Sequence, residues 1–338
     1  MTGRSTGRAL VFRQFGDPAS VLALEPQAMP VAGAVDADAA VIRMSCRPVN
    51  PSDLIPITGA YAHRVMPPRI AGYEGIGLVD QAPAGCGLAV GDRVLPLRGG
   101  GTWASFVVAP ARYCVPVPAS IDDEAAAQAY INPLTAWALL VDDLALPRGA
   151  VIAIDAAGSA FTAVVLALAA DHGWSVVAVT TAPQRTAGLL TSGAAAVVVV
   201  APDDTAADLA ARIRRAAGGA IDAGLDAVGG MIGTAVALSV SPGGAFRVYG
   251  LLSGLPLPAA LAGQVAGGVT VRPFWLRHWQ DQVTVDRWSE GFAWTFDALA
   301  RRRLTLSVAE AFGLDDWQAA LVAAARRDRQ GKVLLSGG

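Results

Sequence analysis

The chain has 338 residues, a length that accommodates roughly two domains of ordinary size. Hydrophobic residues make up 53% of the chain and charged residues 16%, which excludes a largely disordered protein. Lys and Arg number 26 against 28 Asp and Glu, so the net charge of −2 predicts no basic surface for binding a nucleic-acid backbone.

Targeting and disulfide signals are weak throughout the chain. The uncharged runs are interrupted by residues such as Thr, Ser and Gly, so none supplies the roughly 18 consecutive apolar residues that span a bilayer, and residues 1–11 contain no apolar core of a signal peptide. Cys46, Cys86 and Cys114 are too few and too scattered for a disulfide framework or a four-cysteine zinc lobe. We therefore expect a soluble, cytoplasmic protein that binds neither membrane nor nucleic acid.

The first third of the chain consists of short apolar runs separated by Pro and Gly. This pattern, from residue 11 to about residue 118, predicts a compact β-rich unit. Its expected strands are residues 39–44, 75–79, 93–96 and 103–108.

After residue 121 the apolar runs alternate with alanine-rich helical stretches. Expected strands are residues 151–154, 176–180, 196–200, 221–225 and 245–248, and expected helices include residues 161–172 and 204–217. Repeated strand-helix units of this spacing predict a doubly wound parallel sheet with right-handed crossovers. The tail is expected to return to the first domain, with a helix from residue 294, a strand near 304–308, a helix at 315–328 and a strand at 333–335.

The turn that follows the first of these parallel strands is the first chemical motif. It runs from Asp155 through Ala157, Gly158, Ser159 and Ala160 into a helix. Small residues here let a pyrophosphate approach the backbone N–H groups at the helix start. Because Gly158 is the only glycine, an ordinary strand-helix turn packed through alanines is the alternative interpretation.

The second signal concerns the choice of nucleotide. Enzymes that prefer NAD place an acid about 20 residues after the glycine turn, but no acid occurs between Asp171 and Asp203. The strand ends in Thr180 and Thr181, and Arg185 is the one basic residue of that stretch. Hydroxyls and a guanidinium suit a 2′-phosphate, so we expect NADPH to be preferred over NADH. A solvated arginine on an ordinary helix is the alternative.

Six short segments in order resemble the medium-chain dehydrogenase/reductase superfamily. They are Asn-Pro-Ser-Asp at 50–53, Ala-Gly-Tyr-Glu-Gly-Ile-Gly at 71–77, Val-Gly-Asp-Arg-Val at 90–94, Asn-Pro-Leu-Thr-Ala at 132–136, Asp-Ala-Val-Gly-Gly at 226–230 and Gly-Lys-Val at 331–333. The resemblance implies an α/β protein with a GroES-like catalytic domain (residues 1–124 and 294–338) and a Rossmann-type NADPH-binding domain (residues 125–293). It places the active site in the cleft between the two domains.

The resemblance excludes the zinc alcohol dehydrogenases as the nearest branch. A catalytic zinc needs three protein ligands, whereas Tyr73 stands where that branch has its ligand histidine, and Asn50 and Pro51 match the segment of its early cysteine ligand. His63, His172 and His278 have no ligand-like spacing. We therefore predict no metal. Tyr73 either lies near the reaction centre, in the substrate pocket, or fills the volume that a metal would occupy.

The chain resembles the zinc-free branch of the superfamily. Within that branch it resembles the trans-2-enoyl thioester reductases most closely and the quinone oxidoreductases next. In the former a tyrosine at the place of Tyr61 is the proposed proton donor, and Phe274-Trp275 to Trp279 resembles their Phe-Trp-x-x-x-Trp segment. Thr162 stands where relatives usually have glycine, and bulky Phe161 precedes it, which raises a third hypothesis of a reductase-fold scaffold that has lost catalysis. We expect an NADPH-dependent reductase of an activated C=C bond, and the electrophile itself is not identified by the sequence.

Such a reduction delivers hydride to the β-carbon and a proton to the α-carbon. A tyrosine phenol can act as the acid, so Tyr61 and Asn50 are the predicted catalytic residues, with Asn50 orienting substrate or water. A loop aromatic packed at the domain edge and a turn former before Pro51 are the respective alternatives.

The remaining predicted contacts are implied by the resemblance alone. Thr135, Gly250, Trp275 and Lys332 are expected near the cofactor, and Trp275 also in the substrate pocket. Their alternatives are an early-helix hydroxyl for Thr135, a core or interface aromatic for Trp275 and a solvated lysine before an edge strand for Lys332. Relatives dimerise through an edge strand of the nucleotide domain, which predicts a homodimer through residues 269–274.

Overall fold

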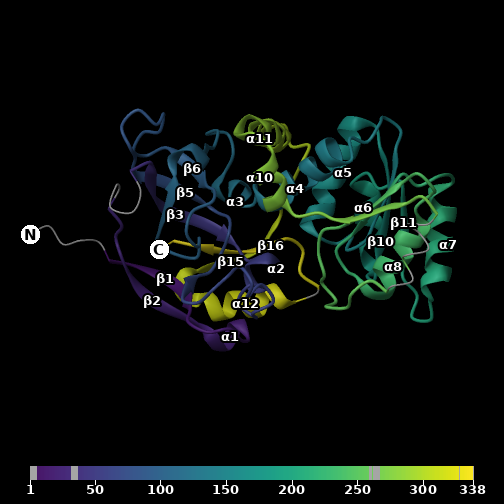
Figure 1. The fold of residues 1–338 in the computed structure, drawn as a ribbon, viewed down its shortest axis with the longest axis horizontal. Helices are drawn as coiled ribbons and strands as arrows, with labels where there is room; N and C mark the ends of the chain where they lie inside the picture. The colour runs from purple at the N-terminus through teal and green to yellow at the C-terminus, as the bar shows by residue number, and fades with distance from the viewer. Residues whose placement is uncertain (1–5, 32–36, 259–260, 262–266, 327, 338) are drawn as a thin grey trace, which may run out of the picture. The chain divides into compact units, whose positions relative to one another are not determined.

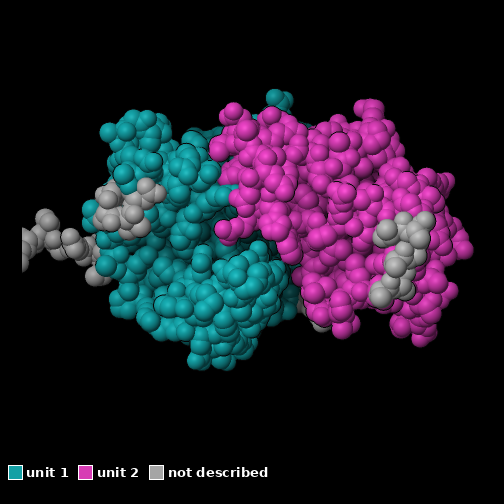
Figure 2. Space-filling model, viewed as in Figure 1, with its two compact units in different colours: residues 1–131, 292–338 teal, residues 132–291 magenta. Residues whose placement is uncertain are grey.

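The computed structural model describes residues 6–31, 37–258, 261, 267–326 and 328–337 (Figure 1). The chain folds into two compact units, which are drawn in different colours in Figure 2. Unit 1 comprises residues 1–131 and 292–338, and unit 2 comprises residues 132–291. The mixed α/β class expected from the sequence is confirmed.

Unit 1 is built mainly from two β-sheets. A three-stranded sheet has the order β2-β1-β4, and a larger sheet has the order β15-β16-β3-β5-β6-β8, with β7 paired to β3. The strands are β1 (Thr6–Phe12), β2 (Leu22–Ala28), β3 (Ala39–Pro48), β4 (Arg69–Ile70), β5 (Ile76–Gln81), β6 (Arg93–Pro96), β7 (Phe106–Pro110), β8 (Cys114–Pro116), β15 (Val308–Gly313) and β16 (Lys332–Ser336). Its helices are α1 (Pro18–Val21), α2 (Pro51–Leu54), η1 (Ala111–Tyr113), α3 (Asp123–Ala126), η5 (Leu314–Asp316) and α12 (Trp317–Ala325).

The C-terminal tail completes the larger sheet of unit 1. Strand β16 pairs antiparallel with β3 and parallel with β15. The guanidinium of Arg47 is fully buried and donates to three backbone carbonyls, those of Thr102, Ala104 and Gly337. These bonds tie β3 to both the tail and the segment before β7.

Two sequence-predicted strands of unit 1 begin later than expected. The strand predicted at 304–308 starts only at Val308, because Leu304 and Leu306 are buried in the connection that precedes it. The strand predicted at 103–108 starts at Phe106, since Trp103 points into the core and its carbonyl accepts from Leu10. The apolar pattern in both segments reports burial rather than a regular strand.

Residues 125–131 belong to unit 1, although the sequence interpretation assigned them to the nucleotide-binding domain. Gln128 donates through its side chain to the carbonyl of Leu306, and the N–H of Ile131 donates to Glu74. These bonds attach the segment to the β-rich unit.

Unit 2 is a doubly wound α/β domain, as predicted. Its six-stranded sheet has the order β11-β10-β9-β12-β13-β14, and all neighbouring strands are parallel. The strands are β9 (Val151–Ile154), β10 (Ser175–Thr180), β11 (Ala196–Val199), β12 (Ala223–Asp226), β13 (Ala245–Val248) and β14 (Thr270–Pro273). The helices include α4 (Ile131–Trp137), which starts at the last residue of unit 1, η2 (Ala138–Asp143), α5 (Ala160–His172), η3 (Pro183–Arg185), α6 (Thr186–Thr191), α7 (Ala206–Ala217), α8 (Gly230–Ser239), α10 (Leu276–Gln282) and α11 (Val285–Ala300), which continues into unit 1.

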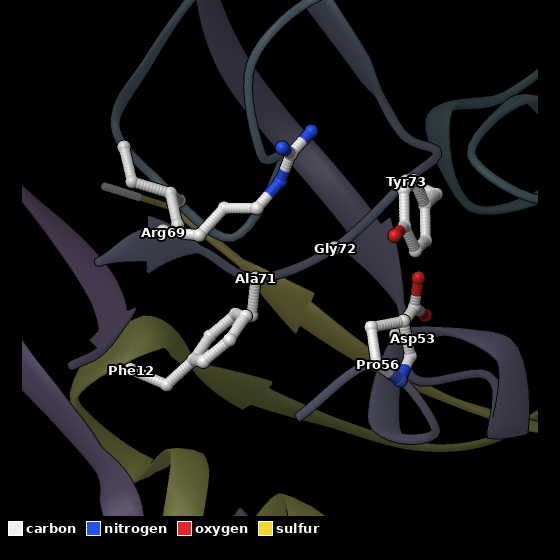
Figure 3. Close-up of a pocket in the computed structure, with 8 residues that line it drawn as sticks. Phe12, Asp53, Pro56, Arg69, Ala71, Gly72 and Tyr73 are labelled. Carbon is white, nitrogen blue, oxygen red and sulfur yellow. The ribbon is translucent and has the colours of Figure 1, made fainter. Parts of the chain in front are cut away.

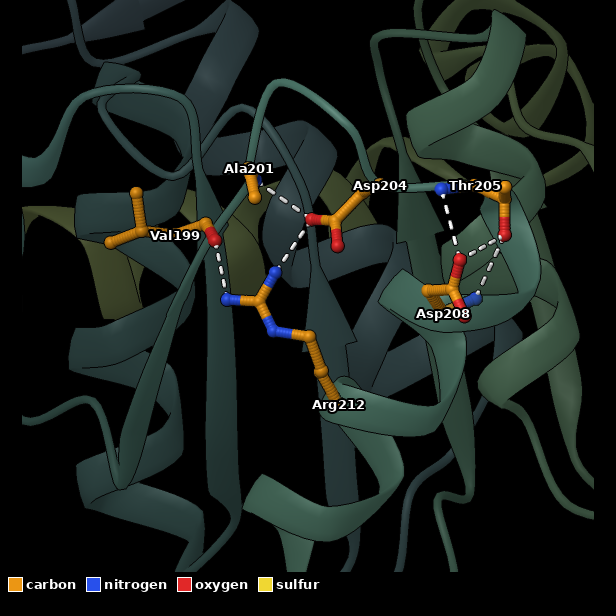
Figure 4. Close-up of polar contacts among 6 residues, drawn as sticks. All are labelled: Val199, Ala201, Asp204, Thr205, Asp208 and Arg212. Atoms are coloured by element: carbon orange, nitrogen blue, oxygen red, sulfur yellow. Dashed lines mark hydrogen bonds and ion pairs between the residues drawn. The ribbon is translucent and has the colours of Figure 1, made fainter.

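Helix α7 shows why the local sequence folds as it does. Thr205 caps the helix through a reciprocal pair of bonds with Asp208, and Arg212 one turn later bonds both the Asp204 carboxylate and the carbonyl of Val199 (Figure 4). A capping box of this kind fixes the first turn of a helix. The helix predicted at 204–217 therefore begins two residues later, at Ala206, after its cap.

The direction of winding reverses between β9 and β12, which are adjacent in the sheet but far apart in the chain. In open α/β sheets ligands bind at the carboxyl ends of the strands at such a reversal. The ends of β9 and β12 are thus the place in unit 2 at which a nucleotide site is expected. Among the residues described, no helix is long and apolar enough to cross a bilayer.

Candidate active site

A buried polar cluster at the start of α2 brings Asn50, Asp53, Glu74 and Lys332 together in unit 1. The Asn50 amide donates to Glu74 Oε1 over 2.6 Å, and its carbonyl oxygen accepts from the Lys332 ammonium. The backbone N–H of Asn50 donates to Asp53 Oδ2 over 2.8 Å, and the second oxygen of Glu74 accepts from the N–H of Ile131 over 2.7 Å. Each of the four side chains is at most 7% exposed.

Glu74 and Lys332 carry opposite charges in a buried site that solvates charge poorly. Burial raises the pKa of Glu74 and lowers that of Lys332, and the attraction between the two groups opposes both shifts. Burial also raises the pKa of Asp53 to about 7, against hydrogen bonds from the backbone of Asn50 and Tyr73. Asp53 therefore carries a proton in a substantial fraction of molecules at neutral pH.

This geometry changes the interpretation of two predicted residues. Lys332 is not a solvated lysine before an edge strand, because β16 lies between β15 and β3 and the ammonium faces Asn50. Asn50 begins α2, as a turn former would, and both ends of its amide are also engaged. The cluster holds the Asn50 side chain in one orientation.

Tyr61 lies on a turn that follows α2. The backbone N–H groups of Arg64 and Val65 both donate to the carbonyl of Tyr61 over 2.9 Å, which closes one helical turn. The Tyr61 ring packs at the edge of a core cluster that includes Phe12 and Trp103, and the residue is partly exposed. The Arg64 guanidinium lies 4.1 Å from the centroid of this ring. The ring is thus held by packing on one side and by a cation on another.

A small pocket in unit 1 contains Tyr73 and Asp53. Figure 3 shows the Tyr73 ring and the Asp53 carboxyl pointing toward one another, with Phe12 and Arg69 on the opposite side. Gly72 in its wall has φ of +90°, and a Cβ there would meet Trp103 Cδ1 at 2.4 Å. A glycine is therefore required at this point of the backbone.

The predicted nucleotide turn of unit 2 forms at the carboxyl end of β9. The Ser159 hydroxyl caps α5 by accepting from the N–H of Thr162. Gly158 leaves room for the Arg185 side chain, whose Cδ and Nε lie 2.9 Å from where a Cβ would stand. The guanidinium also donates to the Gly158 carbonyl over 3.4 Å. A cation and the start of a 13-residue helix consequently share one surface, which suits an anionic ligand.

Phe161 and Thr162 both point into the interior of unit 2. Phe161 is 4% exposed and stacks on Tyr249 with ring centroids 4.1 Å apart. Thr162 is fully buried, and its hydroxyl donates to the carbonyl of Ala156. Neither side chain occupies the solvent-exposed side of the turn.

Sequence reasoning missed a cluster of buried acidic groups beneath this turn. Asp155 Oδ1 accepts from the N–H of Ala227, and Asp226 Oδ1 accepts from the next two N–H groups along the chain. The second oxygens of both carboxyls and the Tyr249 hydroxyl are buried without a hydrogen-bond partner of ordinary geometry. Burial and then the neighbouring Asp226 carboxyl raise the pKa of Asp155 well above its usual range. The available signal was an acid at the end of each of two strongly apolar strands.

The other predicted residues of unit 2 lie mostly at the same edge of the sheet. Thr180 ends β10 and accepts from the N–H of Ala182, Thr181 is exposed beside it, and Gly250 follows β13 against Ala227. Trp275 follows β14 and is 46% exposed. Because the strands are parallel, their carboxyl ends meet at one edge, which brings these residues to the side of Gly158.

Two further side chains have different surroundings. Thr135 is partly exposed on α4. Trp279 is a core residue, which donates to Asp142 over 2.5 Å and packs edge-on against Trp137. Among the described residues no group of three or more His, Cys, Asp or Glu side chains could hold a metal ion.

Comparison with known proteins agrees with this architecture. Residues 36–119 match the alcohol dehydrogenase GroES-like domain. Bovine mitochondrial enoyl-acyl-carrier-protein reductase is 29% identical over 335 residues, which cover 97% of this chain and 88% of that protein. An inferred NADPH:quinone reductase from Bacillus thuringiensis is 36% identical with a TM-score of 0.90, covering 99% of this chain and all of the other. A mycobacterial protein complexed with NADPH is 26% identical with a TM-score of 0.87, covering 98% and 100%.

A GroES-like unit joined to a doubly wound unit with a small-residue turn after its first strand defines a two-domain oxidoreductase. The chain belongs to the medium-chain dehydrogenase/reductase superfamily, in the branch that contains enoyl reductases and quinone oxidoreductases.

Proposed function

We propose that this oxidoreductase uses NADPH to reduce a C=C bond conjugated to a carbonyl, with an enoyl thioester as the first candidate substrate. The observation that carries the proposal is Tyr61, a partly exposed phenol on a turn whose backbone bonds fix it. Support comes from the curated relatives, whose names are those of enoyl reductases along 97% of this chain. That the protein is an oxidoreductase is a more general statement than this proposal, and it does not depend on the proposal.

The residues of unit 2 fit NADPH. The backbone of Ala157, Gly158, Ser159 and Ala160 would face the pyrophosphate at the start of α5, and Arg185 with Thr180 and Thr181 would hold the 2′-phosphate. When bound, this cofactor supplies the hydride for the β-carbon of the substrate. Thr135, Gly250 and Trp275 keep their proposed places near the nicotinamide and the substrate.

Tyr61 would complete the reduction. Its O–H bond breaks as the proton moves to the α-carbon of the enolate, which yields the saturated carbonyl compound and leaves the phenolate to be reprotonated from water. Asn50 acts in this proposal by fixing the start of α2, from which the Tyr61 turn follows, and Glu74 and Lys332 hold Asn50. Tyr73 would line the substrate side of the same unit.

A quinone is the second candidate substrate. The 36% identity to the inferred NADPH:quinone reductase favours it. A quinone needs no positioned acid at carbon, because the hydroquinone takes its proton at oxygen from water. The response to loss of the Tyr61 hydroxyl therefore distinguishes the two substrate classes.

The test combines cofactor titration with a matched pair of variants. NADPH should bind saturably and more tightly than NADH, as followed by nicotinamide fluorescence. Crotonyl thioesters, enones and quinones are then assayed with wild type, Tyr61→Phe and the control Tyr113→Phe, another tyrosine of unit 1 that carries an arginine over its ring. Loss of thioester reduction of roughly 100-fold or more in Tyr61→Phe alone is expected. Equal rates in all three proteins would overturn the proposal. A homodimer and a cytoplasmic location remain predictions.

A further inference from the structure

We infer that Arg64 is a positioning residue for the acid, which holds the Tyr61 ring and stabilises the negative charge that this ring gains as it gives up its proton. The inference rests on the proposed function of Tyr61. The observation that supports the inference is that the Arg64 guanidinium lies over the Tyr61 ring, 4.1 Å from its centroid.

The turn geometry explains this stacking. Arg64 follows Tyr61 by three residues in a helical turn, and residues at this spacing lie on the same face. Val65 is buried at 5% exposure and Ile57 is fully buried, so the turn is anchored to the core on both sides of Tyr61. The His63 ring lies edge-on to the phenol ring with centroids 6.2 Å apart. Arg64 is thus held over the ring by a turn that the buried residues on either side of it attach to the core.

The chemistry makes this contact stronger during the reaction than before it. A guanidinium is attracted to the face of a neutral aromatic ring through the ring quadrupole. When the phenol donates its proton, the ring acquires a full negative charge that is delocalised over its carbons, and the attraction becomes that of an ion pair. Only interactions that strengthen in the transition state accelerate a reaction. Arg64 should therefore raise kcat with little effect on KM.

The test is a double-mutant cycle in the full-length enzyme with crotonyl thioester and NADPH. Arg64→Met should lower kcat by roughly 5- to 20-fold, leave KM within about twofold and increase the solvent deuterium isotope effect on kcat. Arg64→Lys should retain most of the activity, because it keeps a cation. In the Tyr61→Phe background Arg64→Met should cause no further loss. The control Arg112→Met removes the cation over Tyr113, 4.7 Å from that ring, and should leave kcat unchanged.

Each of the following results would overturn the inference. An equal loss in both backgrounds, or a raised KM with unchanged kcat, would mean that Arg64 acts on the substrate rather than through Tyr61. A loss of kcat in Tyr61→Phe without a loss in Arg64→Met would reject the role of Arg64 and leave that of Tyr61 in place. Full activity of Tyr61→Phe, or a wild type that reduces no conjugated thioester, would reject the proposed function and the role of Arg64 with it. Circular dichroism and thermal midpoints of all variants check that the turn still folds.

Discussion

Asp155 and Asp226 place two fully buried carboxyl groups beside one another at the ends of two adjacent parallel strands. Burial, and then the neighbouring Asp226 carboxyl, raise the pKa of Asp155, because the low dielectric of the site makes a doubly charged pair costly. Gly233 of α8 leaves the room for this pair, because a Cβ there would lie 2.5 Å from Asp226 Oδ1. The turn at the carboxyl end of β9 therefore lies over two buried acids, of which Asp155 favours its protonated form.

The first prediction concerns the dependence of stability on pH. Because the pKa of Asp155 is higher in the folded chain than in the unfolded one, its contribution to stability is fully present below about pH 4 and is lost as the pH rises through the folded pKa. Asp155→Asn keeps an acceptor for Ala227 and supplies a donor to Asp226. It should raise the free energy of unfolding at neutral pH by about 1–3 kcal/mol.

Urea unfolding from pH 4 to pH 9 measures this effect. The gain from Asp155→Asn should grow with pH and disappear near pH 4. The control Asp203→Asn makes the same change of charge at an exposed residue and should leave the profile unaltered. A variant that is less stable than wild type at pH 8 would contradict the raised pKa of Asp155.

The second prediction concerns the cluster around Asn50. Lys332→Met leaves the buried Glu74 carboxylate without its cation, so the free energy of unfolding at neutral pH should fall by about 3–5 kcal/mol. Adding Glu74→Gln removes the unpaired charge and should restore more than half of that loss. Chemical denaturation of the two single variants and the double variant gives the coupling energy. Additive losses would show that Lys332 does not compensate Glu74.

Residues of this cluster also show where sequence reasoning ends. Asn50 and Lys332 are 282 residues apart, and they meet only because β16 pairs with β3. Periodicity predicted both strands but not their pairing, and a lysine before a strand is usually solvated. The buried role of Lys332 therefore needed the three-dimensional structure, although the short motif around it was recognised.

The doubly wound unit was the most predictable part of the fold. Strands β9 and β13 match the sequence prediction residue for residue, because each is a short, largely apolar run that closely follows a glycine. Strand β15 was displaced by several residues since its burial pattern is mixed. Gly158 and Arg185, which lie beside one another, were predicted as site residues from residue type and spacing and stay predictions, whereas the stacking of Arg64 on Tyr61 depends on the conformation of a loop.

The third prediction tests the backbone beside Tyr73. Gly72→Ala places a Cβ at a positive φ and 2.4 Å from Trp103, a residue that is fully buried. The free energy of unfolding should fall by about 2–4 kcal/mol, from backbone strain and overpacking together. Gly100→Ala is a suitable control, because nothing lies within 4 Å of the added atom there. Equal thermal midpoints of the two variants would contradict the close packing of Gly72.

The fourth prediction concerns the choice of nucleotide. Arg185 reaches across Gly158 at the start of α5, so its guanidinium lies beside the turn at which the phosphates of a nucleotide are expected. Arg185→Ala should raise the Kd for NADPH by roughly 10-fold, since the lost contact is a partly exposed, charge-assisted hydrogen bond. The Kd for NADH should change by less than about twofold, because NADH has no 2′-phosphate for the arginine to hold. Arg215→Ala, which removes an exposed arginine from α7, should affect neither nucleotide. Titration of nicotinamide fluorescence at two salt concentrations measures the Kd of each nucleotide for wild type and both variants, and the preference for NADPH should weaken at the higher salt concentration. An equal rise of both Kd values would place Arg185 at the pyrophosphate instead of the 2′-phosphate.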